Sequence, residues 1–438
     1  MPTSYTYAGP SVHGYETDRP LRRAAEISVH TSPLAALGSR DAGGMNVYVR
    51  DLSCHLARLG LPIDVFTRRT DPDTPEVTTL CEGVNVVAVT AGPPEPLPKN
   101  NLYQYLPEFA AGVALYAARQ GLRYDVVHSH YWLSGRVARL LQRYWETPFV
   151  HMYHTMAHRK NAVAVGPERE TALRLQVERA LVDQATGLIA ANPDERADLV
   201  WRLDAHPDRV CTIPPGVDLE LFAPRDRAAC RARLGLDRDE VVVLFVGRID
   251  PVKGLDTLLC AARCLHDAAA PVTLVVVGGD LDERGAPTGA LRQVAALAHD
   301  VGVAPRVRLV GAQPQDQLPD FYGAADAVAV PSRYESFGLV AVEAMACGVP
   351  VVASRAGGLA FTVDERAGIL VPPNDPAALA AALRRVVTDP ALRAQLGAGA
   401  RECAERFAWP AIAAEVLHLY ARLAAGSRVH LCRQEVFA

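Results

Sequence analysis

Lysine is almost absent from this chain. Of its 45 basic residues only Lys99, Lys160 and Lys253 are lysines, and the rest are arginines. Arginine can replace lysine on most surfaces, but a planar guanidinium does not reproduce a compact ammonium group against an oxyanion. Each of the three lysines also lies beside a segment that suits a phosphate. We therefore interpret them as candidate phosphate ligands, with leftover surface positions as the alternative.

Other absences exclude whole classes of protein. No apolar run approaches the roughly 20 residues of a membrane-spanning helix. A net charge of -4 without a basic tail argues against nucleic-acid binding. Residues 1–23 lack the apolar core of a signal peptide and predict a flexible extension. Nine cysteines without a CxxC pair predict reduced thiols and a cytoplasmic protein.

The 438 residues are too many for one ordinary core and predict two domains. Apolar, β-branched runs alternate with amphipathic stretches, which is typical of parallel sheets covered by helices on both faces. The expected strands are 27–30, 63–67, 84–89, 125–129, 149–153, 187–191 and 209–213, then 241–247, 273–278, 306–310, 327–331 and 349–354. The series breaks near Pro214-Pro215-Gly216. We expect an α/β protein with two doubly wound Rossmann-like domains, 24–213 and 214–408. A helix over 409–424 would pack back on the first domain, before a tail over 425–438.

Loops that follow parallel strands are where such folds bind ligands. After the first expected strand, Asp41-Ala42-Gly43-Gly44 leads into an amphipathic helix. Paired glycines there let a phosphate approach free backbone N–H groups. After a later strand, Arg248 and Lys253 stand five residues apart across a proline turn. Two converging cations suit a diphosphate leaving group, whereas a solvated basic loop is the alternative.

A second pattern concerns acidic residues. Glu343 is the only charged residue between Phe337 and Ala353, and Glu335 lies eight residues before it. A lone carboxylate in so apolar a helix is costly without hydrogen-bond partners, which sugar hydroxyls would supply. An unrelated buried ion pair is the alternative. We interpret Asp280-Leu281-Asp282 as a loop and not as a metal-binding DxD.

Five histidines crowd the first half of the chain: His128, His130, His151, His154 and His158. His154 and His158 have the spacing of zinc ligands, but Thr155 stands where the HExxH motif has its acid, so we predict no metal site. His130 ends a predicted strand and is the better candidate for direct substrate contact.

Together, GGM near the start, G-R-x4-K-G in mid-chain and E-x7-E at Glu335 and Glu343 resemble family 4 of the retaining, nucleotide-sugar-dependent GT-B glycosyltransferases. The resemblance spans about residues 27–423. HTSPL, DAGGMNVYV, HSHYWLSG and HTMAHRKN look most like the enzymes of mycothiol biosynthesis that transfer N-acetylglucosamine from UDP to 1D-myo-inositol 3-phosphate. The chain departs from those relatives at Ala36-Leu37, where they usually carry Gln-Pro, and at Gln313, where many have arginine.

This resemblance implies roles for individual residues. The implied catalytic residues are His130, beside the anomeric carbon, and Glu335, at the transferred sugar. The implied donor ligands are Gly44, Arg248 and Lys253 for the diphosphate, the backbone of Ser336, Phe337, Gly338 and Leu339, and Glu343 for ribose. The implied acceptor pocket consists of His30, Asp41, Asn46, Lys99, Tyr131, Thr155, Lys160 and Arg174, with Lys99, Thr155 and Arg174 around the phosphate. In such enzymes the leaving phosphate takes the acceptor proton on the same face, so no carboxylate nucleophile is needed. The resemblance implies no required cofactor, and it leaves open stimulation by Mg²⁺ and formation of a homodimer.

Four alternatives remain at this point. Sucrose-phosphate synthase-like enzymes share the layout but typically read GGQ where Met45-Asn46 follows the glycines here. A phosphatidylinositol mannosyltransferase would need membrane contact, for which Arg136, Arg139 and Arg143 are candidates. A nicotinamide-dependent dehydrogenase would need a GxGxxG after the first strand, and this chain has none. A non-catalytic nucleotide-sugar sensor would share the binding residues.

Overall fold

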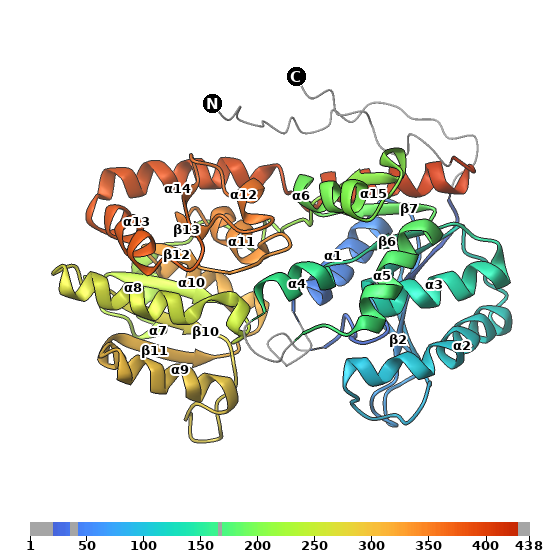
Figure 1. Cartoon of the computed structure of the whole chain (residues 1–438), viewed down its shortest axis with the longest axis horizontal. Helices are drawn as coiled ribbons and strands as arrows, with labels where there is room; N and C mark the ends of the chain where they lie inside the picture. The colour runs from blue at the N-terminus through green and yellow to red at the C-terminus, as the bar shows by residue number, and fades with distance from the viewer. Residues whose placement is uncertain (1–20, 36–42, 165–168, 428–438) are drawn as a thin grey trace.

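The computed structural model describes residues 21–35, 43–164 and 169–427. Within them lie two α/β domains, each built on one central sheet (Figure 1). This arrangement confirms the expected fold class, two doubly wound Rossmann-like domains.

The first domain contains an eight-stranded sheet in the described residues, in the order β3-β4-β2-β1-β5-β6-β7-β8. Its strands are β1 (Ala24–Ile27), β2 (Ile63–Arg68), β3 (Val77–Cys81), β4 (Val84–Val89), β5 (Val126–His130), β6 (Phe149–Met152), β7 (Gly187–Ala190) and β8 (Val210–Thr212). Its helices are α1 (Gly44–Arg58), α2 (Leu106–Arg119), α3 (Tyr131–Trp145), α4 (Ala157–Val163), α5 (Ala172–Gln184) and α6 (Pro193–Ala197). β3 is an antiparallel edge strand, whereas the other neighbouring strands pair in parallel.

The second domain has a parallel sheet in the order β11-β10-β9-β12-β13-β14. Its strands are β9 (Val242–Val246), β10 (Thr273–Val277), β11 (Val307–Gly311), β12 (Ala327–Val330), β13 (Val351–Ser354) and β14 (Gly368–Val371). Its helices are α7 (Arg227–Leu234), α8 (Leu255–Asp267), α9 (Gly289–Asp300), α10 (Leu318–Ala324), α11 (Leu339–Ala346), α12 (Leu359–Thr362), α13 (Pro376–Thr388) and α14 (Pro390–Glu405). Short, largely apolar strands such as β9 and β10 are buried because helices cover both faces of the sheet.

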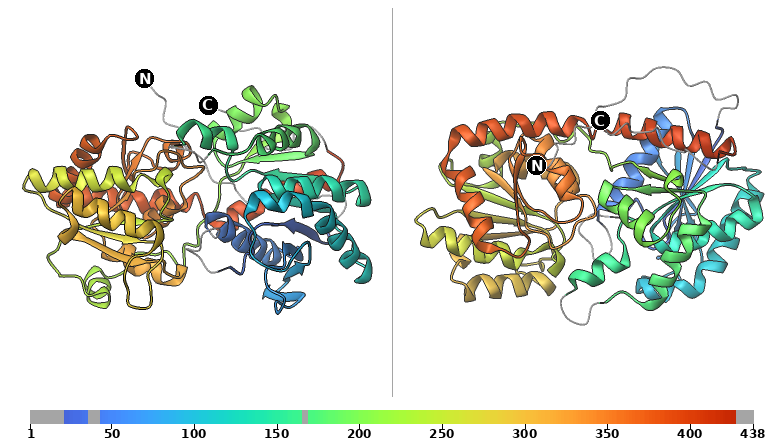
Figure 2. Two further views of the ribbon diagram at one scale, coloured as in Figure 1. Left: turned by 60° about the horizontal axis from the view of Figure 1, so that its bottom comes forward. Right: turned by 45° about the horizontal axis from the view of Figure 1, so that its top comes forward.

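The chain crosses between the domains twice, and the two crossings lie side by side. Val217, on the way out, donates its N–H to the carbonyl of Phe407 at 2.8 Å and forms a bridge with Ala408 on the way back. The returning chain becomes α15 (Trp409–Ala424), which packs on α1 of the first domain. Figure 2 shows α14 and α15 end to end, each on its own domain.

The prediction of reduced thiols is wrong for part of the chain. Cys54 on α1 and Cys81 at the end of β3 form a disulfide, and Cys211 is disulfide-bonded as well. The bridge brings together residues 27 positions apart, so local spacing gives no sign of it. The other described cysteines, Cys230, Cys260, Cys264, Cys347 and Cys403, are free. No described helix combines the length and hydropathy that crossing a membrane requires, and the cytoplasmic location stays a prediction.

Residues 1–20 and 428–438, most of the expected extension and tail, lie outside the described part of the chain. The last residues of the expected extension are held in place. Arg22 pairs with Asp125 at 3.3 Å, and Arg23 pairs with Asp64 at 2.9 Å.

We predict that Gly216→Ala destabilises the junction between the domains. A Cβ atom on Gly216 would lie 2.4 Å from Cδ2 of Trp409, whose ring is buried and packs against Tyr48. Overpacking of this kind costs about 1–3 kcal/mol, so the denaturant midpoint should fall. A Gly216→Ala, Trp409→Leu double variant should recover part of the loss, and an unchanged midpoint in the single variant would contradict the packing described here.

Candidate active site

The two domains meet where the paired glycines begin α1. A Cβ atom on Gly44 would lie 2.9 Å from Cδ1 of Leu339, the first residue of α11, and one on Gly43 would lie 3.8 Å from Cδ of Arg248. The first N–H groups of a helix have no partners inside it. Two helix starts and a guanidinium group therefore converge, an arrangement that attracts an anion.

Lys253 and Glu335, predicted ligands from different loops, contact each other directly. The Lys253 ammonium lies 2.5 Å from Glu335 Oε2. Lys253 reaches this position because Gly254 follows it with a φ of +68, where a Cβ atom would lie 2.1 Å from the carbonyl oxygen of Pro331. Arg248 is 3.8 Å from Asp250 and remains 44% exposed. This loop therefore offers two cations, each beside a carboxylate, and Arg248 is the more accessible of them.

Glu343 is buried at the domain boundary and has the hydrogen-bond partner that its sequence context demanded. The Tyr322 hydroxyl donates to Oε2 of Glu343 at 2.7 Å. Burial is the main reason why the pKa of Glu343 rises to about 7, with hydrogen bonds from Tyr322 and Gln315 opposing the rise. Arg50 of α1 donates to Gln315, so this corner connects both domains.

A second contact joins the domains at the turn before α11. The Asn192 side chain donates from Nδ2 to the carbonyl oxygen of Ser336 at 2.5 Å. Gly338 then adopts a φ of +97 and starts the helix. The loop from Ser336 to Leu339 is thus fixed from the opposite domain, although its role as a donor ligand stays a prediction.

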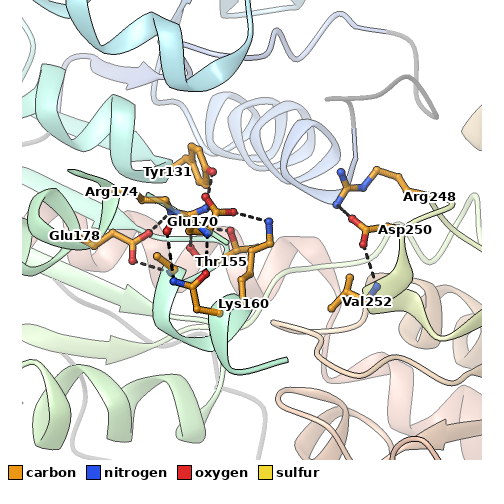
Figure 3. Close-up of polar contacts among 11 residues, drawn as sticks. Tyr131, Thr155, Lys160, Glu170, Arg174, Glu178, Arg248, Asp250 and Val252 are labelled. Carbon is orange, nitrogen blue, oxygen red and sulfur yellow. Dashed lines mark hydrogen bonds and ion pairs between the residues drawn. The ribbon is translucent and has the colours of Figure 1, made fainter. Parts of the chain in front are cut away.

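The predicted acceptor residues form a compact network around Arg174, whose side chain is fully buried (Figure 3). Its guanidinium donates to Glu178 Oε1 at 2.6 Å, to the Tyr131 hydroxyl at 2.7 Å and to the Thr155 carbonyl at 2.6 Å. Tyr131 follows β5 and Thr155 follows β6, so one side chain on α5 connects the ends of two strands. In Figure 3 this network lies on the first domain, and Arg248 with Asp250 lies on the other.

Glu170 places a carboxylate among the predicted phosphate ligands. Its Oε1 atom is 2.6 Å from the Lys160 ammonium and 2.9 Å from Nη1 of Arg174. Although burial opposes ionisation, Arg174, Lys160 and Lys99 together lower the pKa of Glu170 to about 2. The site therefore already holds one carboxylate between cations.

Two further predicted pocket residues line the first strand's end. The His30 and Tyr131 rings lie 4.5 Å apart, and burial, Lys99 and Arg174 lower the pKa of His30 to about 3, which keeps it neutral. Asn46 is 2% exposed and donates to both Thr31 Oγ1 and the Ser32 carbonyl at 2.6 Å. Asn46 thus holds the loop in shape and is itself covered. Asp41 lies outside the described residues.

The prediction that His130 contacts substrate directly does not fit its position. His130 has no exposed surface, because it points into the sheet face beneath Tyr48. His154 is half-buried, and its Nε2 lies 3.1 Å from His130 Nδ1. Burial, together with His130, His151 and His30, lowers the pKa of His154. His154 is thus the less buried imidazole of the two.

Two residues at or beside the Arg174 network, Tyr131 and His154, have a strained backbone. Tyr131 has a φ of +76 and His154 a φ of +58, values that residues with side chains rarely adopt. Such conformations cost about 1–3 kcal/mol and cluster at functional sites.

His158, the other residue with zinc-like spacing, bonds Asp198 at 2.6 Å and takes no part in this site.

Sequence reasoning missed His154, Glu170, Glu178 and Asn192. Glu170, Arg174 and Glu178 carried a signal, because opposite charges four residues apart on a helix pair with each other. His154 carried none, since its positive φ is not visible in the sequence.

Two family models match the chain. The model described as Glycosyltransferase Family 4 matches residues 42–221, and the one described as Glycosyl transferases group 1 matches residues 226–403. A Kineococcus radiotolerans protein named D-inositol 3-phosphate glycosyltransferase is 45% identical over 92% of this chain and 95% of its own length. A Frankia alni protein of the same name is 47% identical over 90% of this chain and 97% of its own.

Solved structures give the same architecture. A sucrose-phosphate synthase from Thermosynechococcus elongatus superposes with a TM-score of 0.85 and 40% identity, over 93% of this chain and all of that one. The Anabaena protein HepE, in complex with UDP and glucose, has a TM-score of 0.69 and 22% identity, over 91% and 98% of the two chains. At that identity the second likeness shows the fold alone.

We predict that Glu343 makes the protein less stable as pH rises. Its pKa is about 7 in the folded chain, against about 4.3 in an unfolded one. The folded state therefore binds the proton more tightly, and the stabilisation is lost as pH rises from about 4.3 to about 7, by roughly 4 kcal/mol. Glu343→Gln should gain thermal stability over the wild type across this window. Exposed Glu283→Gln is the matched control, and parallel wild-type and Glu343→Gln profiles would contradict the assignment.

Proposed function

This chain belongs to glycosyltransferase family 4, and on that premise we propose that it moves N-acetylglucosamine from its UDP derivative to 1D-myo-inositol 3-phosphate, with retention at the anomeric carbon. The names of the relatives that match over nine-tenths of the chain support the acceptor. The donor sugar and the stereochemistry come from the resemblance in the motifs, and the experiments below test them.

The observation that carries the acceptor assignment is the Glu170 carboxylate. It lies between the Lys160 ammonium and the Arg174 guanidinium, and Lys99 also lowers its pKa. A carboxylate bound in this way is a stand-in for a phosphate group, which cations of this type bind with charge-assisted hydrogen bonds. Because Arg174 is fully buried, a phosphate reaches it only when Glu170 moves aside. We propose that the acceptor phosphate replaces this carboxylate.

The proposed binding of the donor diphosphate is supported by the loop of the second domain that carries Arg248 and Lys253. Arg248 and Lys253 bring two cations to the start of α11, whose first N–H groups add a partial positive charge. A diphosphate bound there has its charge balanced as it leaves, and this lowers the barrier to departure. Glu335, held by Lys253, is positioned for hydroxyl groups of the transferred sugar. Glu343 would accept hydrogen bonds from ribose, in exchange for its bond from Tyr322.

The proposed reaction needs no enzyme nucleophile. The acceptor oxygen forms a bond with the anomeric carbon as the bond from that carbon to the diphosphate breaks, and the acceptor proton passes to the departing phosphate oxygen. His154 is half-buried beside this point, and its lowered pKa keeps it neutral. A neutral imidazole can hydrogen-bond a sugar hydroxyl without adding charge. Catalysis would then come from positioning and charge stabilisation.

A second candidate function is the transfer of glucose to a hexose phosphate. The 40% identity with a sucrose-phosphate synthase favours it, and the cation cluster suits any sugar phosphate. A matrix of donors and acceptors distinguishes the two: UDP-N-acetylglucosamine, UDP-glucose and a GDP-sugar against inositol phosphate, fructose 6-phosphate and glucose 6-phosphate, read by nucleotide release. Turnover only with fructose 6-phosphate would replace the first proposal with the second, and binding without turnover would indicate a sensor.

We predict that Lys253→Ala weakens UDP binding. The variant loses one charge-assisted contact with phosphate, worth about 1.5–3 kcal/mol, so the affinity should fall by roughly tenfold to a hundredfold. Titration calorimetry measures the change. Arg263→Ala, an arginine on the exposed side of α8 that pairs with Asp267, is the matched control. Unchanged UDP affinity in both Lys253→Ala and Glu343→Ala would remove the donor site from this loop.

We predict opposite effects on the acceptor from Lys99→Ala and Glu170→Gln. Losing the Lys99 cation should raise the acceptor KM, whereas removing the competing Glu170 charge should lower it, each on the order of tenfold or 1.4 kcal/mol. Steady-state kinetics at saturating donor measure both.

The control for this pair is Glu178→Gln. Glu178 also binds Arg174, but it accepts a hydrogen bond from the Ala157 backbone on the buried side of the network. This variant should reduce stability without lowering the acceptor KM. If Glu170→Gln raises the KM as Lys99→Ala does, Glu170 belongs to the binding site and does not compete with the phosphate.

A further inference from the structure

Three side chains of types that commonly bind metals, one carboxylate and two imidazoles, meet inside the first domain, away from solvent. Glu26 on β1 is the register partner of His128 on β5, and His130 lies two residues further along β5. Since alternate residues of a strand point to the same face, all three share one side of the sheet. None of them has exposed surface. Apolar side chains would be expected at such positions, so this charge and these two imidazoles need an explanation.

Their free atoms converge. One nitrogen of each histidine and a carboxylate oxygen of Glu26 lie within 4.8 Å of one another. Nε2 of His128, Nε2 of His130 and Oε1 of Glu26 have no hydrogen-bond partner among the residues that the structure describes. An unsatisfied buried polar atom costs about 1–3 kcal/mol. Three of them in one place therefore call for a shared partner.

The other ring nitrogen of each histidine, Nδ1, already has a hydrogen-bond partner. His128 Nδ1 is 2.7 Å from the Tyr420 hydroxyl on α15, and His130 Nδ1 is 3.1 Å from His154 Nε2. Ser53 of α1 donates to Oε2 of Glu26 at 2.8 Å. Hydrogen bonds on the far side of each ligand are the usual support of a metal site, because they fix the tautomer and the ring orientation.

The spacing does not fit a direct hydrogen bond between His130 and Glu26. His130 Nε2 lies 3.5 Å from Oε2 of Glu26, the oxygen that Ser53 already holds, and this is longer than the 2.7–2.9 Å or so of a charged N–H···O bond. Oε1 of Glu26 and Nε2 of His130 therefore both remain without a partner in the described part of the chain. Two imidazoles and one carboxylate are also a set of ligands that zinc takes in proteins.

We propose that Glu26, His128 and His130 bind a Zn²⁺ ion in the interior of the first domain. The ion joins β1 to β5 beneath α1 and α15. With zinc on Nε2 of His130, the proton of that ring is on Nδ1 and is donated to His154 Nε2. The proton of neutral His154 is then on its own Nδ1. The metal site stands whether or not the proposed transfer reaction is correct, because its evidence is the buried cluster alone.

The test measures metal content in the untagged full-length chain, expressed with added zinc and passed through gel filtration with a mild chelator. Mass spectrometry should find about one zinc per chain in the wild type and less than about a tenth of that in Glu26→Leu. Leu suits the buried sheet position, so this variant should fold, and circular dichroism checks that it does. His299→Ala, which removes a histidine exposed by 86%, should keep its zinc.

Two further measurements keep the proposal falsifiable if Glu26→Leu fails to fold. Tyr420→Phe removes only the bond to His128 Nδ1 and should weaken zinc affinity by about tenfold to a hundredfold. Stripped wild-type protein should take up Co²⁺ with the visible absorption of a tetrahedral site. A wild type with neither zinc nor a cobalt spectrum, or Glu26→Leu with full zinc content, would overturn the proposal and leave Glu26 and His130 as a buried ion pair.

Discussion

A fully buried arginine holds one edge of the first domain together. Arg174 binds the residues that follow β5 and β6 and two carboxylates of its own helix region, Glu170 and Glu178. Taking such a cation out of water is costly unless every donor is satisfied, and removal of one partner from a buried pair costs about 3–5 kcal/mol. Glu178, Tyr131 and Thr155 therefore hold Arg174 in one position. The strained backbone of Tyr131 persists because this network over-determines it.

The fold was largely predictable from the sequence because parallel strands buried on both faces are short apolar runs. The exceptions have physical reasons. β1 was expected at 27–30 but pairs as Ala24–Ile27, since its position depends on the register with β2 and β5 and not on propensity. β3 was missed because it is a partly exposed, antiparallel edge strand. β14 was missed as well, although β7, equally short and also starting with glycine, was predicted.

The candidate site was predictable where its chemistry depends on residue type. It was less predictable where the chemistry depends on which way a side chain points. Lys253 and Glu335 do lie together, as do Lys160 and Arg174 around one carboxylate. His128 and His130, in contrast, are buried against one face of the sheet. Side chains at the end of a strand face one side of the sheet or the other. The sequence of β5 does not show which side α1 and α15 will cover, and therefore does not show which side chains become buried. His154 stays half-buried, and its backbone turns into the left-handed region.

The paired crossings at Val217 and Ala408 have a mechanical consequence. Two crossings bonded side by side restrain the junction more than a single crossing would. Any separation of the two domains must part Asn192 from Ser336 and Gly44 from Leu339. The junction therefore bears directly on the contacts at the start of α11.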